Sequence, residues 1–419
     1  MSSPVWHPFT QHGLDEPVPL VTRAEGAALY TADGRRVIDA ISSWWVTTHG
    51  HCHPRIMAAI RAQAETLDQL IFAGWTHEPA ETVARQLVAM MPRPLDHVFF
   101  SDSGSTSVEV ALKMALGHFA NRGEAKNGQR HRIVVMAGSY HGDTVGGMSV
   151  GARGVFNRSY APLLFDVDVI PFPEAGHEQA TIDVFERCCE QRPAALIVEP
   201  LVLGAGGMKM YPAWVLKALR ELCAAHGVLF IADEVMTAWG RTGTLLACGQ
   251  AGVVPDLLCL SKGLTGGSLP LAVTMATGEI FESHRSPDRS KMFFHSSSYT
   301  ANPIACAAAV ANLQIWSEEP VLERVADLAR RQAARGAGLE GKVNNLRQLG
   351  TIVAMELEER EGAYLSALGP QLMGFFRERD VLLRPLGNTV YVMPPYCISD
   401  DDLGRVYDVI CEAIEAFAG

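Results

Sequence analysis

The stretch "LLCLSKGLTGG" (257–267) is the most informative in the chain, because it places a lysine directly after a short apolar run. "LLCL" is typical of a buried strand, and the glycines that follow are typical of a tight turn. Lysine is almost never fully buried unless its amine has a partner. Lys262 therefore either extends to solvent from a loop or has an amine that is chemically engaged, and the rest of the chain bears on that choice.

Short apolar runs alternate with helical patterns over roughly residues 95–280. Runs typical of strands buried on both faces of a parallel or mostly parallel sheet are "HVFF" (97–100), "IVVM" (133–136), "ALIV" (195–198), "VLFIAD" (228–233), "LLCL" (257–260) and "LAVTMAT" (271–277). A helix is predicted over 213–227, where a terminal glycine suits the C′ position. Another is predicted over 302–316, with Asn302 as N-cap and Pro303 at N1. The alternation predicts an α/β fold whose mostly parallel central sheet is flanked by helices.

The patterns of apolar and polar residues at both chain ends differ from those of this middle region. After about residue 318 an arginine-rich helix leads into alternating strands and helices, which predicts a small α+β domain. Near the N-terminus, "AALYTADGRRVIDAIS" (27–42) predicts a hairpin that is able to pair with that domain. We therefore expect residues 1–50 to join the small domain, residues 51–318 to form the large domain, and residues 319–419 to form the small α+β domain.

The totals limit the class of protein. A chain of 419 residues, with 48% hydrophobic and 19% charged residues, is globular in composition. Its formal net charge of −11 argues against general affinity for nucleic acid or an anionic membrane. No apolar run is long enough to cross a bilayer, and the first residues lack the pattern of a signal peptide. Nine cysteines without a C-x-x-C pair fit a reducing compartment, so we expect a cytoplasmic protein.

A carboxylate ends another predicted strand, in "VLFIADEV" (228–235). Burying Asp233 there is costly unless it meets a cation or a strong donor. If the strand continues, Asp233 and Val235 share one face. The carboxyl ends of strands in open α/β sheets line the binding crevice, where a partly desolvated Lys262 amine becomes a Schiff-base nucleophile. The alternatives are a helix cap or structural salt bridge for Asp233 and a solvated loop for Lys262.

Two further stretches also follow predicted strands. "FFSDSGSTSVEVALKMAL" (99–116) predicts a strand, a small-residue turn and a helix, with Thr106 and Glu109 forming a capping box. Such a helix start suits a phosphate, although an ordinary capped helix is the alternative. "GSYHGDT" (138–144) places Tyr140 on a loop, where its ring either stacks on a flat ligand or simply packs.

Together these features match one cofactor. A phosphate-bearing aldehyde needs an anion-binding helix start, a lysine for an imine, an aromatic face and a carboxylate for its ring nitrogen, and pyridoxal 5′-phosphate requires that set. Neither a Walker loop nor a G-x-G-x-x-G fingerprint occurs in the chain. The sequence therefore favours pyridoxal phosphate over a nucleotide.

Four motifs carry a resemblance to a known family. They are "DSGSTSVEVALKMA" (102–115), "SYHGDT" (139–144), "ADEVMTAWGRTG" (232–243) and "CLSKGLTGG" (259–267). In these the chain resembles the class III pyridoxal-phosphate aminotransferases of fold type I, and the resemblance runs nearly end to end. It implies that Lys262 holds the cofactor as an imine and moves a proton, and that Asp233 pairs with the pyridine nitrogen. It also implies that Val235 and Tyr140 cover the two faces of the ring, with Tyr140 counted among the catalytic residues.

The same resemblance implies a phosphate site shared between two subunits. Gly104 and Ser105 match the family's phosphate-binding turn. Ser298 stands where the family has a threonine donated by the partner subunit, and it keeps the hydroxyl. A homodimer with interface active sites is therefore expected. No metal is implied, and "HGHCHP" (49–54) is interpreted as a turn near the active site.

A narrower resemblance concerns the substrate. "WHPFTQ" (6–11), "SSWWVTTHGHCHP" (42–54), "SYHGDTVGGMSV" (139–150) and "RPLGNTVYVMPPY" (384–396) are similar to the members of this family that serve biotin biosynthesis. This implies 8-amino-7-oxononanoate as the amino acceptor and S-adenosylmethionine as the donor, with lysine as a known variation. The implied substrate-binding residues are Phe9, Trp44, Tyr140, Ser296 and Arg384, of which Arg384 takes the acceptor's carboxylate.

Some positions and some activities remain open. Phe9 stands where some members have a tyrosine, and Leu203 where a glutamine is frequent. A class III enzyme acting on another ω-amine, such as ornithine, 4-aminobutyrate or a diamine, is the nearest alternative. A catalytically silent protein on the same fold is a second alternative, against which the intact pair of Lys262 and Asp233 argues.

Overall fold

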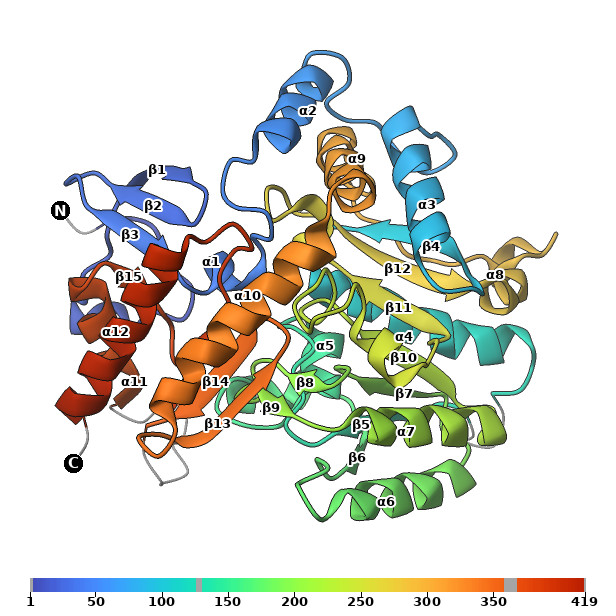
Figure 1. Cartoon of the computed structure of the whole chain (residues 1–419). Coiled ribbons are helices and arrows are strands. Elements are labelled where there is room, and N and C mark those ends of the chain that lie inside the picture. The colour runs from blue at the N-terminus through green and yellow to red at the C-terminus, as the bar shows by residue number, and fades with distance from the viewer. Residues whose placement is uncertain (1–2, 126–129, 358–367, 418–419) are drawn as a thin grey trace.

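The computed structural model describes residues 3–125, 130–357 and 368–417 (Figure 1). A seven-stranded sheet in the order β4-β12-β11-β10-β7-β5-β6 forms its centre. The strands are β4 (Leu95–Ser101), β5 (Ile133–Met136), β6 (Asp168–Ile170), β7 (Ala195–Val198), β10 (Leu229–Asp233), β11 (Leu257–Leu260) and β12 (Ala272–Thr277). All pairs from β11 to β6 are parallel, whereas β12 runs antiparallel to both β11 and β4. The predicted mostly parallel sheet is confirmed; β6 is an additional short edge strand.

Alternate residues of the central strands belong to two separate hydrophobic clusters. Val134 lies in one cluster and its neighbour Val135 in the other. Leu258 and Cys259 of β11 are divided in the same way. Both faces of the sheet are therefore buried, which explains why these strands consist of continuous apolar runs.

Helices from the large part of the chain surround this sheet (Figure 1). They are α2 (Pro54–Ala64), α3 (Glu78–Met90), α4 (Gly104–Asn121), α5 (Val145–Val150), α6 (Glu178–Glu190), α7 (Ala213–His226), α8 (Gly278–His284) and α9 (Pro303–Glu318). The predicted end of α7 is confirmed, since Gly227 takes the left-handed conformation with φ 61°. The predicted start of α9 is also confirmed, because the Asn302 side chain accepts hydrogen bonds from the N–H groups of Ile304 and Ala305.

The two chain ends meet in a smaller sheet of order β1-β2-β3-β15. Its strands are β1 (Val21–Glu25), β2 (Ala28–Thr31), β3 (Arg36–Asp39) and β15 (Val381–Leu382). The predicted hairpin corresponds to β2 and β3, and β3 pairs in parallel with β15. Figure 1 accordingly shows β1–β3 beside the C-terminal helices α11 (Leu368–Glu378) and α12 (Asp400–Phe417). Through this strand pairing the N-terminal residues pack against the C-terminal region of the chain.

The remaining elements complete the C-terminal region and the connections. They are α1 (Ser42–Trp45), β8 (Val202–Leu203), β9 (Lys209–Met210), α10 (Val321–Gly336), β13 (Asn344–Leu349), β14 (Ile352–Glu356), α11 (Leu368–Glu378), β16 (Thr389–Val392) and α12 (Asp400–Phe417). Short 3-10 turns are η1 (His12–Leu14), η2 (Arg158–Leu163), η3 (Ala247–Ala251), η4 (Lys262–Thr265), η5 (Arg289–Lys291) and η6 (Ala337–Leu339). The β13-β14-β16 sheet is antiparallel. Among the described helices, none is both long and apolar enough to cross a membrane.

Candidate active site

The two strand-end residues singled out in the sequence lie at one edge of the central sheet. Asp233 is the last residue of β10, and Lys262 begins η4 directly after β11. The strands are parallel, with Asp233 opposite Cys259. Lys262 has a left-handed backbone with φ 46°. Parallel pairing thus brings a carboxylate and a lysine from adjacent strands to the same crevice.

Lys262 lies in surroundings that favour a reactive amine. Loss of water around its amine lowers its pKa to about 8, although the nearby carboxylates of Asp233 and Glu199 act in the opposite direction. Nζ lies 5.0 Å from the ring centroid of Trp45. The fully buried Asn312 donates hydrogen bonds to the carbonyl groups of the two residues after Lys262, at 2.9 and 3.0 Å. The amine is therefore placed by buried groups and is available in its neutral form near pH 8.

Asp233 is held on both carboxylate oxygens. Its Oδ2 lies 2.7 Å from Nδ1 of His141, and its Oδ1 accepts a hydrogen bond from the N–H of Val235 at 3.1 Å. β10 ends at Asp233, so the sequence-based reason for placing Asp233 and Val235 on one strand face is wrong. The chain turns back at this point instead. A Cβ atom added to Gly104 would lie 2.6 Å from Cγ1 of Val235, which places Val235 beside the start of α4.

The start of α4 is formed differently from the predicted capping box. Ser103 is the N-cap, and its side chain and that of Thr106 cap each other's backbone N–H groups. The predicted pair of Thr106 and Glu109 is wrong because the helix begins earlier, at Gly104. Glu109 instead accepts a hydrogen bond from the N–H of Gly146 at 2.6 Å. The first N–H groups of α4 still point out of the helix end, as an anion site requires.

The loop carrying Tyr140 rests on this helix start. The N–H of Asp143 donates to Oγ of Ser105 at 3.3 Å. Gly142 has φ 108°, and a Cβ atom added there would lie 1.9 Å from the same Oγ, so only glycine permits the contact. Tyr140 donates its backbone N–H to Oε1 of Glu199 at 2.9 Å. Tyr140, Gly142 and Asp143 line a cavity of about 950 Å³.

Three of the predicted substrate residues meet at a second part of the site. The Arg384 guanidinium lies 5.0 Å from the ring centroid of Trp44 and donates to the carbonyl oxygen of Phe9 at 3.3 Å. The rings of Phe9 and Trp44 lie 5.5 Å apart. Phe156, which lines the cavity described above, extends this group with its ring 6.1 Å from that of Phe9. A cation thus lies beside an exposed aromatic wall.

Two predicted residues are not brought to Lys262 by the contacts of this single chain. The carbonyl oxygen of Ser298 accepts a hydrogen bond from Gln69 at 2.5 Å. Oγ of Ser296 donates to the carbonyl oxygen of Ser297 at 3.2 Å. These contacts involve none of the residues around Lys262, so the roles expected for Ser296 and Ser298 stay predictions.

Several neighbours of the site were not predicted as site residues. His141 contacts Asp233, and the buried Glu199 contacts the Tyr140 loop; burial raises the pKa of Glu199 to about 7. Trp45 lies under the lysine amine, and Phe156 faces Phe9. Glu199 was predictable from the sequence, because this acidic residue directly follows the apolar strand β7, just as Asp233 lies at the end of β10.

Other conspicuous residues have structural partners. Arg241 is buried and donates to the carbonyl oxygens of Pro394 and Thr47, as expected for a structural role. Burial lowers the pKa of His49 to about 4. Among residues 3–125, 130–357 and 368–417, no group of three or more His, Cys, Asp or Glu side chains is placed to hold a metal ion.

The residues present fit pyridoxal 5′-phosphate. The crevice offers an amine with a lowered pKa in Lys262, a buried carboxylate in Asp233, and a helix start at Gly104 against which the side chain of Val235 packs closely. Tyr140 adds an aromatic ring at the cavity wall. Fold and site together define an α/β enzyme of the pyridoxal-phosphate-dependent type.

The comparisons with known proteins agree. The family model described as aminotransferase class-III matches residues 9–414. The chain is 45% identical to adenosylmethionine-8-amino-7-oxononanoate aminotransferase of Synechococcus elongatus, over 98% of each chain. It is 38% identical to the protein of that name from Nitratidesulfovibrio vulgaris, over 98% of this chain and 80% of the other.

Solved structures are similar as well. A crystal structure of adenosylmethionine-8-amino-7-oxononanoate aminotransferase from Methanocaldococcus jannaschii has a TM-score of 0.93 and 32% identity, covering 99% of this chain and 97% of the other. An amine transaminase from an uncultivated Pseudomonas species has a TM-score of 0.90 and 30% identity, covering 99% of each chain. The chain belongs to the class-III aminotransferase family, and it is a pyridoxal-phosphate-dependent enzyme.

Proposed function

We propose that the protein transfers an amino group from S-adenosylmethionine to 8-amino-7-oxononanoate, giving 7,8-diaminononanoate for biotin biosynthesis. The observation that carries this proposal is the placement of Arg384 against the exposed ring of Trp44, which packs beside the ring of Phe9, and against the carbonyl oxygen of Phe9. A guanidinium beside an apolar wall suits a carboxylate on an alkyl chain. The names of the similar proteins from Synechococcus and Methanocaldococcus support the same substrate.

The cofactor, when bound, supplies an aldehyde carbon for the amine and a ring that stabilises negative charge at the carbon losing its proton. Lys262 Nζ would hold the cofactor and then carry a proton between two carbons. Asp233 would accept a hydrogen bond from the ring nitrogen, and His141 Nδ1 at 2.7 Å keeps that carboxylate in place. Because the two substrates would bind in turn in the same site, the same residues would serve both half-reactions.

The remaining assignments follow from where each residue lies. Val235 and Tyr140 would pack on opposite faces of the ring, and the N–H groups at Gly104 and Ser105 would bind the phosphate. Ser298 would reach the phosphate of the other subunit in a homodimer, and Ser296 would line the neighbouring substrate pocket. We also propose that the enzyme works in the cytoplasm, where its small-molecule substrates are made.

The pH dependence of cofactor capture tests the role of Lys262. We expect cofactor-free protein to react with pyridoxal 5′-phosphate at a rate that rises with pH through about 8 and then levels off. The neutral amine is the nucleophile, and burial lowers the pKa of Lys262 to about 8, so the reactive fraction grows as pH increases past that value. Stopped-flow absorbance across the pH range measures this rate. A midpoint above about pH 10, the range of an ordinary lysine, would contradict the assignment.

The substrate assignment is tested by the visible spectrum and by a substrate panel. We expect S-adenosylmethionine to bleach the yellow cofactor band and 8-amino-7-oxononanoate to restore it. Arg384→Ala should raise KM for this acceptor by roughly 10- to 150-fold, since a hydrogen bond to a charged group contributes about 1.5–3 kcal/mol. The methyl ester of the acceptor is the matched control, because it should lose affinity for the native enzyme but lose little more with Arg384→Ala.

Other outcomes of the panel separate the alternatives. Bleaching by lysine but not by S-adenosylmethionine would change the donor and keep the acceptor. Turnover of simple amines with pyruvate, and none with 8-amino-7-oxononanoate, would favour an ω-amine transaminase, which the similarity to the Pseudomonas amine transaminase makes the second candidate.

A further inference from the structure

The segment that carries the two tryptophans has an unusual backbone. Ser42, Ser43, Trp44 and Trp45 have φ values of 54°, 46°, 69° and 75°, so four successive residues form a left-handed turn (α1). L-residues other than glycine enter this region mostly singly, because Cβ approaches the following carbonyl oxygen. None of the four is glycine, so side-chain contacts must hold the turn.

One buried carboxylate makes several of these contacts. Asp39, the last residue of β3, is fully inaccessible to solvent. Its Oδ1 accepts hydrogen bonds from the N–H groups of Ser43 at 2.9 Å and Ile41 at 3.3 Å. Its Oδ2 accepts from Oγ of Ser43 at 2.8 Å and lies 2.8 Å from Nε2 of His51. The carboxylate therefore joins the strand, the turn and the loop beyond it.

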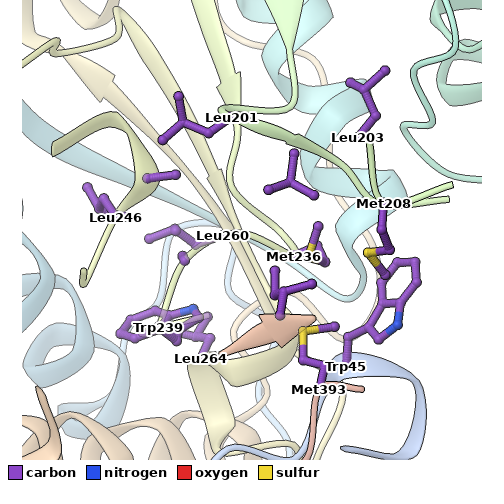
Figure 2. Packing of buried hydrophobic residues seen from close by; sticks show 14 of the residues in the cluster. Trp45, Leu201, Leu203, Met208, Met236, Trp239, Leu246, Leu260, Leu264 and Met393 are labelled. Carbon is purple, nitrogen blue, oxygen red and sulfur yellow. The ribbon is translucent and has the colours of Figure 1, made fainter. Parts of the chain in front are cut away.

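The turn directs its two tryptophans to two different parts of the site. Trp45 points inward among the buried residues of Figure 2, near Met393. Its indole N–H donates to the hydroxyl of Tyr391 at 3.0 Å, and its ring lies 5.0 Å from Nζ of Lys262. Trp44 is exposed and faces Arg384. Two adjacent side chains in an extended strand would also point in opposite directions. The left-handed turn differs because it also keeps the backbone of Ser43 close enough to Asp39 for hydrogen bonds.

We infer that Asp39 is a positioning residue for substrate recognition, holding the left-handed turn that places the ring of Trp45 against Lys262 and the ring of Trp44 against Arg384. Asp39 itself touches neither of these cations in the contacts described. Its effect on the reaction passes through the two tryptophans. The part of this inference that concerns the substrate rests on the proposed function, whereas the part that concerns the tryptophans does not.

The experiment uses full-length holoenzyme carrying 5-fluorotryptophan. Fluorine NMR resonances of the two residues are assigned with Trp44→Phe and Trp45→Phe. Asp39→Ala should shift or broaden both resonances and lower kcat/KM for the acceptor by up to about 100-fold, the scale expected for a displaced binding group. Asp380→Ala is the matched control, because Asp380 lies next to the same small sheet and forms an exposed ion pair with Arg35 at 2.6 Å.

A glycine rescue separates positioning from general stability. Ser43→Gly removes the Cβ that disfavours the left-handed backbone, so Asp39→Ala combined with Ser43→Gly should recover part of both the fluorine spectrum and kcat/KM. A variant that had only lost stability would, while folded, keep the native tryptophan resonances, so the fluorine spectrum distinguishes the two cases. If Asp39→Ala does not fold, Asp39→Asn gives the same reading, since the NH2 that takes the place of Oδ2 is a donor and cannot accept from Oγ of Ser43.

Two results would overturn the inference. One is an Asp39 variant whose tryptophan resonances match those of the native protein. The other is a shifted spectrum that Ser43→Gly leaves unchanged. If the enzyme proved to use other substrates, the fluorine spectrum would still decide the positioning role, so the failure of the proposed function is distinguishable from the failure of this inference.

Discussion

Replacing Lys262 with alanine is expected to abolish transamination, lowering kcat by on the order of 10⁴-fold or more. The change removes the amine proposed both to hold the cofactor and to carry the proton, and proton transfer by a positioned group alone contributes about 10²–10⁴-fold. Steady-state kinetics measure the loss of rate. Mass spectrometry after borohydride reduction measures the loss of covalent cofactor, which should be complete.

The neighbouring cavity supplies a matched control. Lys209 lines the 950 Å³ cavity but forms an exposed ion pair with Glu174 at 3.2 Å. Lys209→Ala should therefore retain both covalent cofactor and turnover within a few-fold of the native enzyme. Lys262→Arg should be as inactive as Lys262→Ala, because a guanidinium stays protonated at working pH. Turnover and borohydride-trapped cofactor in Lys262→Ala would show that another amine does the chemistry.

Lys262 and Asp233 were predictable because strand ends are readable in a sequence. Runs such as "LLCL" are apolar throughout, since residues on both sheet faces are buried, and a charged residue directly after such a run is conspicuous. Parallel pairing then dictates that the two strand ends share one edge. Glu199 shows the same pattern, because it is a charged residue directly after the apolar strand β7.

Other parts of the site depend on contacts that sequence spacing does not encode. Phe9 and Arg384 meet across 375 positions, and their meeting depends on the packing of the two chain ends. The left-handed turn at 42–45 contains no glycine, so its sequence does not predict a left-handed backbone. The helix start was misplaced because two capping patterns overlap there, and only the geometry of Ser103 and Thr106 decides between them. The role predicted for Ser298 requires a contact with a second subunit, and the sequence pattern of one chain does not specify such a contact.

Asp233→Ala is expected to lower kcat by about 10²–10³-fold while the protein stays folded. Asp233 is buried, and removing one preorganised group that stabilises charge in the transition state costs about 2.7–4 kcal/mol, each 1.36 kcal/mol being a factor of ten in rate. In the proposed role Asp233 would keep the ring nitrogen protonated, and a protonated ring would draw electrons more strongly than a neutral one. Steady-state kinetics and the visible spectrum of the loaded variant measure the effect.

A charged cofactor analogue makes this prediction specific to the ring nitrogen. Pyridoxal 5′-phosphate methylated on that nitrogen carries a fixed positive charge and needs no carboxylate, so it should restore roughly ten-fold or more of the activity lost in Asp233→Ala. Asp256 is the control at the opposite end of the same strands, where it pairs with Arg220 at 3.0 Å. Asp256→Ala should lower the melting temperature, because it breaks a partly buried pair, and leave kcat nearly unchanged with either cofactor. If the methylated analogue did not rescue Asp233→Ala although that variant still bound the ordinary cofactor, the carboxylate would act on the position of His141 and its loop, and its assignment to the ring nitrogen would be wrong.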